Sequence, residues 1–236
     1  MDKKEAHARE EICRIGASLF SRSYVHATAG NISVRLEDGY LITPTDACLG
    51  NLDPANISKL SFDLQHISGD IASKTIALHA SIYSATAKFN SKIACVIHTH
   101  STYCVAQSLA TKANQNELLP AITPYFVMKV GHVPLIPYHR PGDPKVAQIV
   151  ADTIAKFAQA GTPIRAVMLS RRGPNVWHDS PAQAMAVLEE LEETAKLMHL
   201  SKEALSPLSE SQIQELRDTF GAMWVDRSKS KKQESR

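Results

Sequence analysis

The sequence lacks any apolar run approaching the roughly 20 residues of a membrane-spanning helix. Its charged N-terminus also lacks the apolar core of a secretory signal. No internal repeat and no Pro-, Gly- or Ser-rich linker divides the 236 residues. The four cysteines form no C-x-x-C pair, which indicates buried thiols rather than a redox or metal motif. These absences favour one cytoplasmic domain over residues 1–226.

The formal net charge of +2 does not indicate a nucleic-acid partner, because the excess of basic residues lies at the C-terminal end of the sequence. The last ten residues, 227–236, hold five basic and one acidic side chain. Residues 1–226 therefore hold 21 basic and 23 acidic residues, with a formal charge of −2. A Lys- and Ser-rich terminus is typically a solvated end. We expect residues 227–236 to be a disordered basic tail, and we expect neither a nucleic acid nor a membrane as partner.

Hydrophobic spacing predicts a mixture of helices and short strands. Helices are predicted up to residue 21 and over 74–89, 101–110, 146–161, 181–199 and 209–220. Strand pairs are predicted at 31–36 with 40–43, at 57–62 with 65–68, and at 166–170 with 175–178. The run 93–98 predicts a central strand, and the proline-rich segment 119–143 predicts short strands with turns. This pattern indicates a largely antiparallel sheet covered by helices, without a dinucleotide-binding fingerprint.

His98-Thr99-His100 is the sharpest chemical signal in the sequence. Residues i and i+2 at a strand end project to one side, so both imidazoles can converge on one ion. Two neutral imidazoles suit zinc or another late first-row divalent ion. An H-x-H pair is also common as ordinary polar residues, and both interpretations stay open from the residues alone.

Three short segments have features of an anion site. The turn before Asn31 is built from small residues, which let backbone N–H groups approach a ligand. Ser73 and Lys74 precede a predicted helix, where a hydroxyl, a positive charge and free N–H groups favour phosphate. Thr45 follows a predicted strand. A plain turn or a helix cap explains each segment equally well when it is taken singly.

Taken together, these motifs resemble the class II aldolase/adducin family over about residues 8–200. The resemblance is carried by AGNIS at 29–33, LITPT at 41–45, SK at 73–74 before a helix with His79, and VIHTHS at 96–101. Other stretches are similar to one branch, the 3-oxo-tetronate 4-phosphate decarboxylases. They are CLGNLDP at 48–54, TPY at 123–125, VPLIPY at 133–138, RPGD at 140–143 and LEELEETAK at 188–196.

The resemblance implies an α/β fold of three layers (αβα) with a mainly antiparallel central sheet. It implies a homotetramer with active sites between subunits, and a Zn²⁺-type ion that chelates the substrate. It matches His98 and His100 with metal ligands, and Tyr125 with a tyrosine that can protonate the reacting carbon, including from a neighbouring subunit. It matches four residues with the phosphate pocket: Asn31, Thr45, Ser73 and Lys74.

Three positions depart from the family pattern. Arg172 stands where the resemblance implies a third metal-binding histidine, and a guanidinium cannot ligate a cation. Thr75 stands where it implies a catalytic glutamate, and a hydroxyl cannot act as a carboxylate base. Asp46 replaces a glycine after the Thr-Pro-Thr motif, which places a carboxylate near the expected phosphate.

These departures predict weak metal binding. Two protein ligands are fewer than the three expected at a catalytic zinc, and Arg172 would repel the ion. His79, His132 or His139 could supply another ligand, although a packing or surface role explains each of them better. Alternatively, Arg172 could replace the charge of the metal in stabilising an enolate.

The sequence thus predicts a carbon–carbon lyase of sugar-acid catabolism. The expected reaction converts a 3-oxo-tetronate 4-phosphate into dihydroxyacetone phosphate and carbon dioxide. Decarboxylation needs no base beyond the ionised carboxylate of the substrate, so losing the glutamate costs less here than in a retro-aldol reaction. Two alternatives are a catalytically silent, adducin-like binding or scaffold protein, and a sugar-phosphate aldolase or epimerase.

Overall fold

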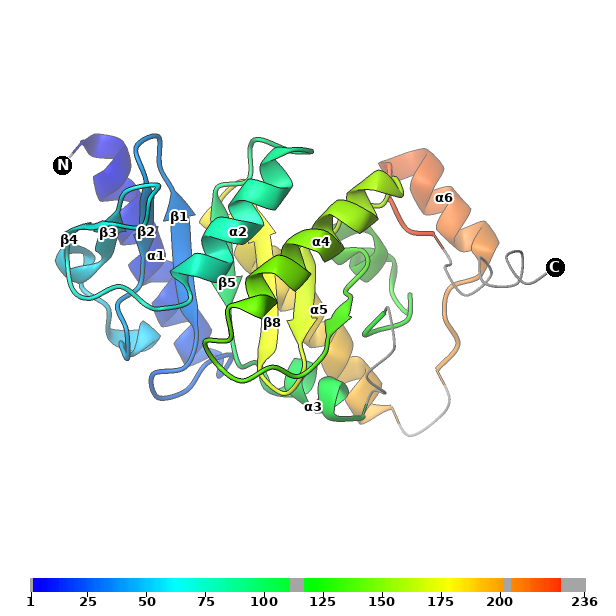
Figure 1. Ribbon diagram of the computed structural model, residues 1–236. Coiled ribbons are helices and arrows are strands. Elements are labelled where there is room, and N and C mark those ends of the chain that lie inside the picture. Colours follow the sequence, from blue (N-terminus) through cyan, green and yellow to red (C-terminus); the bar gives the residue numbers. More distant parts are fainter. Residues whose placement is uncertain (1, 111–116, 202–204, 226–236) are drawn as a thin grey trace.

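The computed structural model describes residues 2–110, 117–201 and 205–225, so the predicted tail at 227–236 lies outside the described residues. Its centre is an eight-stranded sheet in the order β4-β3-β2-β1-β5-β8-β7-β6 (Figure 1). The strands are β1 (Asn31–Arg35), β2 (Tyr40–Ile42), β3 (Ser58–Leu60), β4 (His66–Ser68), β5 (Cys95–His98), β6 (Leu135–Ile136), β7 (Ala166–Leu169) and β8 (Gly173–His178). All neighbours pair antiparallel except β6 and β7, which are parallel.

Helices cover both faces of this sheet. The α-helices are α1 (Lys3–Ser21), α2 (Ile76–Ala87), α3 (Thr102–Ala110), α4 (Lys145–Gln159), α5 (Pro181–Leu200) and α6 (Glu210–Phe220). Helices α2 and α4 pack together on the face nearest the viewer in Figure 1. Helices α1, α3 and α5 lie on the other face, and each face has its own hydrophobic core. The expected three-layer fold is confirmed.

The two cores account for the sequence pattern. Strand β5 is buried along its whole length, because apolar helices cover it from both sides. Helix α4 ends just before Gly161, whose φ of 73° is the left-handed conformation that favours glycine after a helix. Within the described residues, no helix combines the length and the apolar character that crossing a membrane requires.

Three local expectations need correction. Segment 119–143 contains only one short strand, β6, and its other regular element is a π-helical turn, η3 (Phe126–Val130). The prolines of this segment hid the turn, because helical spacing over five residues is too short to detect. Strand β8 begins at Gly173, two residues earlier than expected. Cys13 and Cys48 are half-buried rather than buried, whereas the other two cysteines are buried as expected.

Candidate active site

A cleft of about 480 Å³ lies where the ends of α2 and α4 meet the β7–β8 turn. Its lining brings together five residues that the sequence singled out, with Asp46 beside them: Thr45, Ser73, Lys74, Thr75 and Arg172. The segment 141–147, which leads into α4, forms the opposite wall. The volume lies within the range of small-molecule sites, about 300–1,000 Å³.

Two backbone segments hold the polar wall of the cleft. The N–H of Thr45 donates to the carbonyl of Ile71 at 2.8 Å, and the N–H of Ser73 donates to the carbonyl of Thr43 at 3.3 Å. The hydroxyls of Ser73 and Thr75 are hydrogen-bonded at 2.8 Å. The segment that follows Thr45 therefore lies directly against the start of α2, as a two-sided phosphate cradle requires.

Asp46 has a backbone φ of 54°, in the left-handed region. Aspartate tolerates this conformation better than most residues do, and glycine adopts it without strain. The turn thus has the geometry expected of the family glycine, although an exposed carboxylate now occupies it. This carboxylate lowers the positive potential of the cleft beside Lys74.

Lys74 and Arg172 give the cleft its positive charge. Neither side chain makes a hydrogen bond or an ion pair with another described residue. Burial lowers the pKa of Arg172 from its usual value, and the nearby Tyr138 opposes this shift. A guanidinium still remains protonated, so two cations without an ion-pair partner among the described residues face the cleft, together with the carboxylates of Asp46 and Asp143.

The β7–β8 turn holds the backbone of Arg172 in a fixed position. Gly173 has a φ of 130°, and a Cβ at this position would lie 1.9 Å from the carbonyl oxygen of Thr99. The backbone N–H of Arg171 donates to the hydroxyl of Ser108 at 3.0 Å. The turn is therefore pressed against the segment between His98 and His100, and Arg172 lies beside both histidines.

His98 has the environment of a metal-binding imidazole. Its Nδ1–H donates to the carbonyl of Pro174 at 2.9 Å, which leaves the lone pair of Nε2 available. Burial, followed by the effects of His100 and Arg172, lowers the pKa of His98 to about 3, so the ring is neutral. The ring centroids of His98 and His100 are 5.1 Å apart, and His26 follows at 6.2 Å from His100.

A row of buried polar groups crosses the sheet beneath α2. Asn31, His98 and Asn175 are cross-strand neighbours on β1, β5 and β8, so their side chains share one face. The Oδ1 of Asn31, both amide atoms of Asn175 and the Nε2 of His79 have no hydrogen-bond partner among the described residues. Buried polar atoms are rarely left unpaired, so this row indicates a polar ligand or ordered water.

Asn175 and His26 are not among the residues that the sequence singled out. Asn175 lies in an otherwise apolar, fully buried stretch of β8, and a polar residue in such a strand was the available signal. His26 is exposed in a loop, and no local pattern connects it with His100. Asn31 lies in the row described above and does not line the cleft.

Of the other histidines considered as replacement ligands, His132 has both ring nitrogens hydrogen-bonded, whereas His79 and His139 are engaged through Nδ1 as His98 is, and none of the three lines the cleft. His132 is hydrogen-bonded to Glu117 through Nδ1, and its Nε2 accepts from the N–H of Val225 at 3.2 Å. His139 Nδ1 lies 3.1 Å from Asp143 Oδ2. His79 is fully buried, and its Nδ1 lies 2.7 Å from the hydroxyl of Ser33.

Tyr125 lies apart from these groups. It precedes η3, is 60% exposed and is not part of the cleft lining. Within a single chain it therefore faces solvent rather than the other predicted site residues.

Residues 10–199 match the family model of the class II aldolase and adducin N-terminal domain. This chain belongs to the class II aldolase and adducin family. Members of this family generally use a divalent metal ion. The donor set in this chain does not fit a catalytic zinc, because no group of three His, Cys, Asp or Glu side chains within the described residues could hold an ion. Arg172 adds positive charge at the same place.

Relatives within the class II aldolase and adducin family span almost the whole chain. The 3-oxo-tetronate 4-phosphate decarboxylase of Cupriavidus necator is 52% identical over 225 residues, covering 93% of this chain and 99% of that protein. The enzyme of the same name from Escherichia coli K12 is 41% identical over 217 residues, covering 91% and 97%.

Solved structures agree with the family fold. The crystal structure of YgbL from Escherichia coli has a TM-score of 0.81 at 40% identity and covers 91% of this chain and 100% of that chain. The L-fuculose-1-phosphate aldolase of Thermus thermophilus has a TM-score of 0.69 at 22% identity, covering 82% and 93%, and supports the fold alone.

Proposed function

We propose that this chain decarboxylates a 3-oxo-tetronate 4-phosphate to dihydroxyacetone phosphate and carbon dioxide. The observation that carries the proposal is the cleft with two cations that have no ion-pair partner among the described residues, Lys74 and Arg172, in a chain 52% identical to a decarboxylase of that name. The substrate has two anionic groups, a phosphate and a carboxylate, and the two cations match them in sign and number.

The phosphate is assigned to the start of α2. Ser73 supplies a hydroxyl, Lys74 a charge, and the start of the helix supplies the positive end of its dipole. Thr45 closes the pocket from the facing segment. Asn31 and the polar row below the cleft are available for the hydroxyl and carbonyl oxygens of the substrate.

Cleavage of the carbon–carbon bond leaves an electron pair on C2 that must be stabilised. The bond between the carboxylate carbon and C2 breaks, carbon dioxide leaves, and the electron pair moves into the C3 carbonyl to form an enediolate. Arg172 stabilises the negative charge on that oxygen, where a relative with a metal would use the ion. Thr75 takes part through its hydrogen bond with Ser73 and supplies no base.

A proton must reach C2 to complete dihydroxyacetone phosphate. Tyr125 is our candidate donor, acting from a neighbouring subunit of a homotetramer, because its exposed ring does not reach the cleft of its own chain. Water is the alternative donor. Tyr125→Phe in D2O distinguishes the two donors: with Tyr125 as donor, the variant should have a lower kcat and should lose the stereospecificity of deuterium incorporation at C2, whereas a water donor leaves both unchanged.

The decisive experiment combines metal analysis with turnover of synthetic 3-oxo-tetronate 4-phosphates. We expect dihydroxyacetone phosphate to form, with a rate that EDTA does not change. The double variant Arg172→His, Thr75→Glu should bind zinc with a stoichiometry that the wild type does not reach. Absence of turnover with every stereoisomer, with and without added divalent metal, would refute the assignment.

One observation favours a different function, a silent binding or scaffold member of the family. The incomplete donor set and Thr75 remove the metal ligand and the base that the resemblance implies. On that hypothesis the cleft still binds the phosphorylated sugar acid but releases it unchanged. Binding of the substrate without any product under the assay above identifies this outcome.

A further inference from the structure

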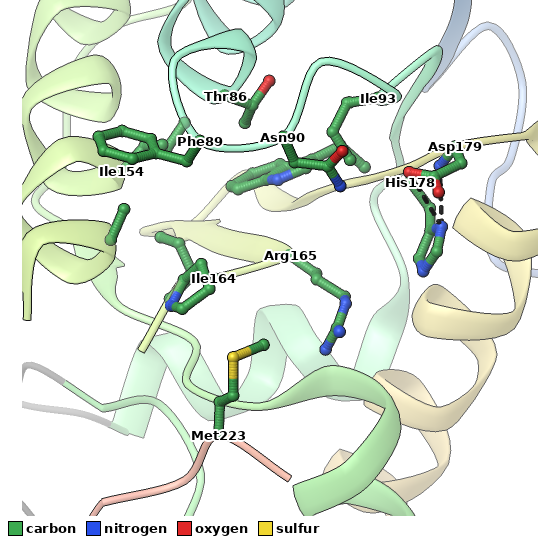
Figure 2. A pocket seen from close by; sticks show the side chains of 13 residues that line it. Thr86, Phe89, Asn90, Ile93, Ile154, Ile164, Arg165, His178, Asp179 and Met223 are labelled. Atoms are coloured by element: carbon green, nitrogen blue, oxygen red, sulfur yellow. Dashed lines mark hydrogen bonds and ion pairs between the residues drawn. The ribbon is translucent and has the colours of Figure 1, made fainter. Parts of the chain in front are cut away.

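Strands β7 and β8 connect the cleft with a second cavity at their other ends. Arg172 lies at the turn that joins the strands, whereas Arg165 precedes β7 and His178 ends β8. This cavity has a volume of about 270 Å³, close to the lower end of ligand sites, about 300 Å³. Figure 2 shows side chains from five separate parts of the chain converging on it.

One side of the cavity is apolar. Phe89 follows α2, Ile154 belongs to α4, Ile164 precedes β7 and Met223 follows α6. Phe89 and Met223 are both well exposed although they border the cavity. An apolar group of a ligand would cover these two side chains and remove their surface from water.

The other side of the cavity contains a cation without a partner. The half-buried guanidinium of Arg165 makes no hydrogen bond or ion pair with any residue that the structure describes. Burial lowers the pKa of Arg165, and Asp179 opposes this shift. Figure 2 shows the guanidinium directed into the space between Met223 and His178.

A carboxylate oxygen nearby also lacks a donor. The Oδ1 of Asp179 is buried and has no hydrogen-bond partner among the described residues. It lies 3.7 Å from Nδ1 of His178, but that nitrogen accepts the N–H of Asp179 at 2.8 Å and has no proton to give. The side chains of Arg165 and Asp179 do not form an ion pair with each other. Both side chains line the cavity, and because Oδ1 is buried, a ligand would meet the Asp179 carboxylate at its exposed part.

We propose that this cavity binds a small organic acid with a hydrogen-bond donor on the carbon next to its carboxylate and an apolar substituent beyond it. The carboxylate pairs with Arg165, and the neighbouring hydroxyl or ammonium donates to Asp179. The substituent lies against Phe89, Ile154 and Met223. Two-point recognition follows because the guanidinium can only donate and the ionised carboxylate can only accept.

Isothermal titration of the full chain with three probes tests this proposal. The probes are 3-phenyllactate, phenylalanine and 3-phenylpropionate, which has no donor. We expect one of the first two to bind, which identifies the donor as hydroxyl or ammonium, and 3-phenylpropionate to bind about tenfold or more weakly.

Variants separate this site from non-specific binding. Arg165→Gln should weaken the bound probe by about tenfold or more, and Asp179→Asn should abolish the preference over 3-phenylpropionate. Ala158→Leu fills the cavity from α4 without changing its charge and should also prevent binding. Arg14→Gln, on an exposed helix pair with Glu11, should change nothing. No heat from any probe at millimolar concentration, or equal binding to wild type and Ala158→Leu, would overturn the proposal.

Discussion

Two regions of the molecule differ in whether their cations have a partner within the chain. Beneath α1, Arg9 donates to Glu5 at 2.9 Å and to two backbone carbonyls, and Lys59 contacts both Glu5 and Asp38. At the cleft, Arg172 has no such partner among the described residues. Each cation of the first region is paired with a carboxylate of the chain, whereas Arg172 at the cleft has no such partner among the described residues.

The difference separates cations that stabilise the fold from cations that recognise something. Removing one member of a buried, hydrogen-bonded ion pair leaves an uncompensated charge, which costs about 3–5 kcal/mol. Removing an unpaired cation removes a desolvation cost instead. Mutations of the Arg9 ion pairs should therefore lower stability, whereas mutations of the cations at the cleft should lower activity.

The largest expected effect is on stability, from Arg9→Met. This variant leaves Glu5 buried with only Lys59 as partner, and the free energy of unfolding should fall by about 3–5 kcal/mol. Urea unfolding measures it. The control Arg14→Met removes an exposed pair and should cost no more than about 1 kcal/mol. Equal losses in the two variants would show that burial of the Arg9 network does not matter.

Arg172→Met should have the largest effect on activity. Loss of the charge that stabilises the enediolate should lower kcat about 100- to 1,000-fold, the usual size for an oxyanion-stabilising donor. The free energy of unfolding should stay unchanged or rise, because a half-buried unpaired cation is gone. Arg172→Lys, which retains charge, should recover part of the rate. A destabilised Arg172→Met protein would contradict the contrast between the two regions.

The stability of the protein should depend on pH in two ranges, one set by His79 and a lower one set by Glu5. Burial lowers the pKa of His79 to about 3, so between about pH 6.5 and 3 the unfolded chain binds a proton that the folded chain does not. Stability must then fall as pH falls, by up to about 1.4 kcal/mol per pH unit and imidazole.

Glu5 acts at lower pH. Burial raises its pKa, but the hydrogen bonds from Lys59 and Arg9 outweigh burial and lower it below 4.5. Its contribution to stability is lost only as pH falls through that lowered value.

Urea unfolding of His79→Asn from pH 7 to 5 should therefore show a smaller pH slope than the wild type. An unchanged slope would mean that His79 has the same pKa in the folded and the unfolded chain.

Lys74→Met should act mainly on binding. A charged hydrogen bond to phosphate contributes about 1.5–3 kcal/mol, so KM and the inhibition constant of inorganic phosphate should rise about 10- to 100-fold. The value of kcat should change much less, because the phosphate does not react. Lys74→Arg serves as the matched control. A fall in kcat at constant KM would place Lys74 near the reacting carbon instead.

The smallest effect is expected from Asp46. Because its carboxylate is exposed, its repulsion of a bound phosphate should be about 1 kcal/mol or less. Asp46→Asn should lower the inhibition constant of phosphate a few-fold. Asp46→Gly should do the same and also relieve the left-handed backbone. Weaker phosphate binding in both variants would show that Asp46 is part of the recognition.

Much of the fold was predictable because local patterns decide it. The strand pair predicted at 31–36 and 40–43 is the hairpin of β1 and β2, and the apolar run at 93–98 predicted the central strand. The short turn η3 was not predictable, because five residues between prolines carry no periodic signal. Its stability comes instead from packing against α5 and α6, contacts that a local pattern does not contain.

The site was predictable in composition but not in arrangement. The motifs at Thr45, Ser73 and Arg172 identified a shared site, and the structure gathers them in one cleft. The alignment of Asn175 with His98 depends on the register between β5 and β8, which nothing in either strand specifies alone. Whether Tyr125 takes part depends on assembly, and a single chain does not contain that information.

The close contact at Gly173 has a consequence for how the site can change. Because the backbone of the turn is fixed against Thr99, the side chain at position 172 can be exchanged without moving its point of attachment. The backbone at position 172 therefore stays in the same place whether the side chain is a short imidazole or a long guanidinium. The chemistry of the cleft can thus be re-specified at one residue while every hydrogen bond of the central sheet stays in place.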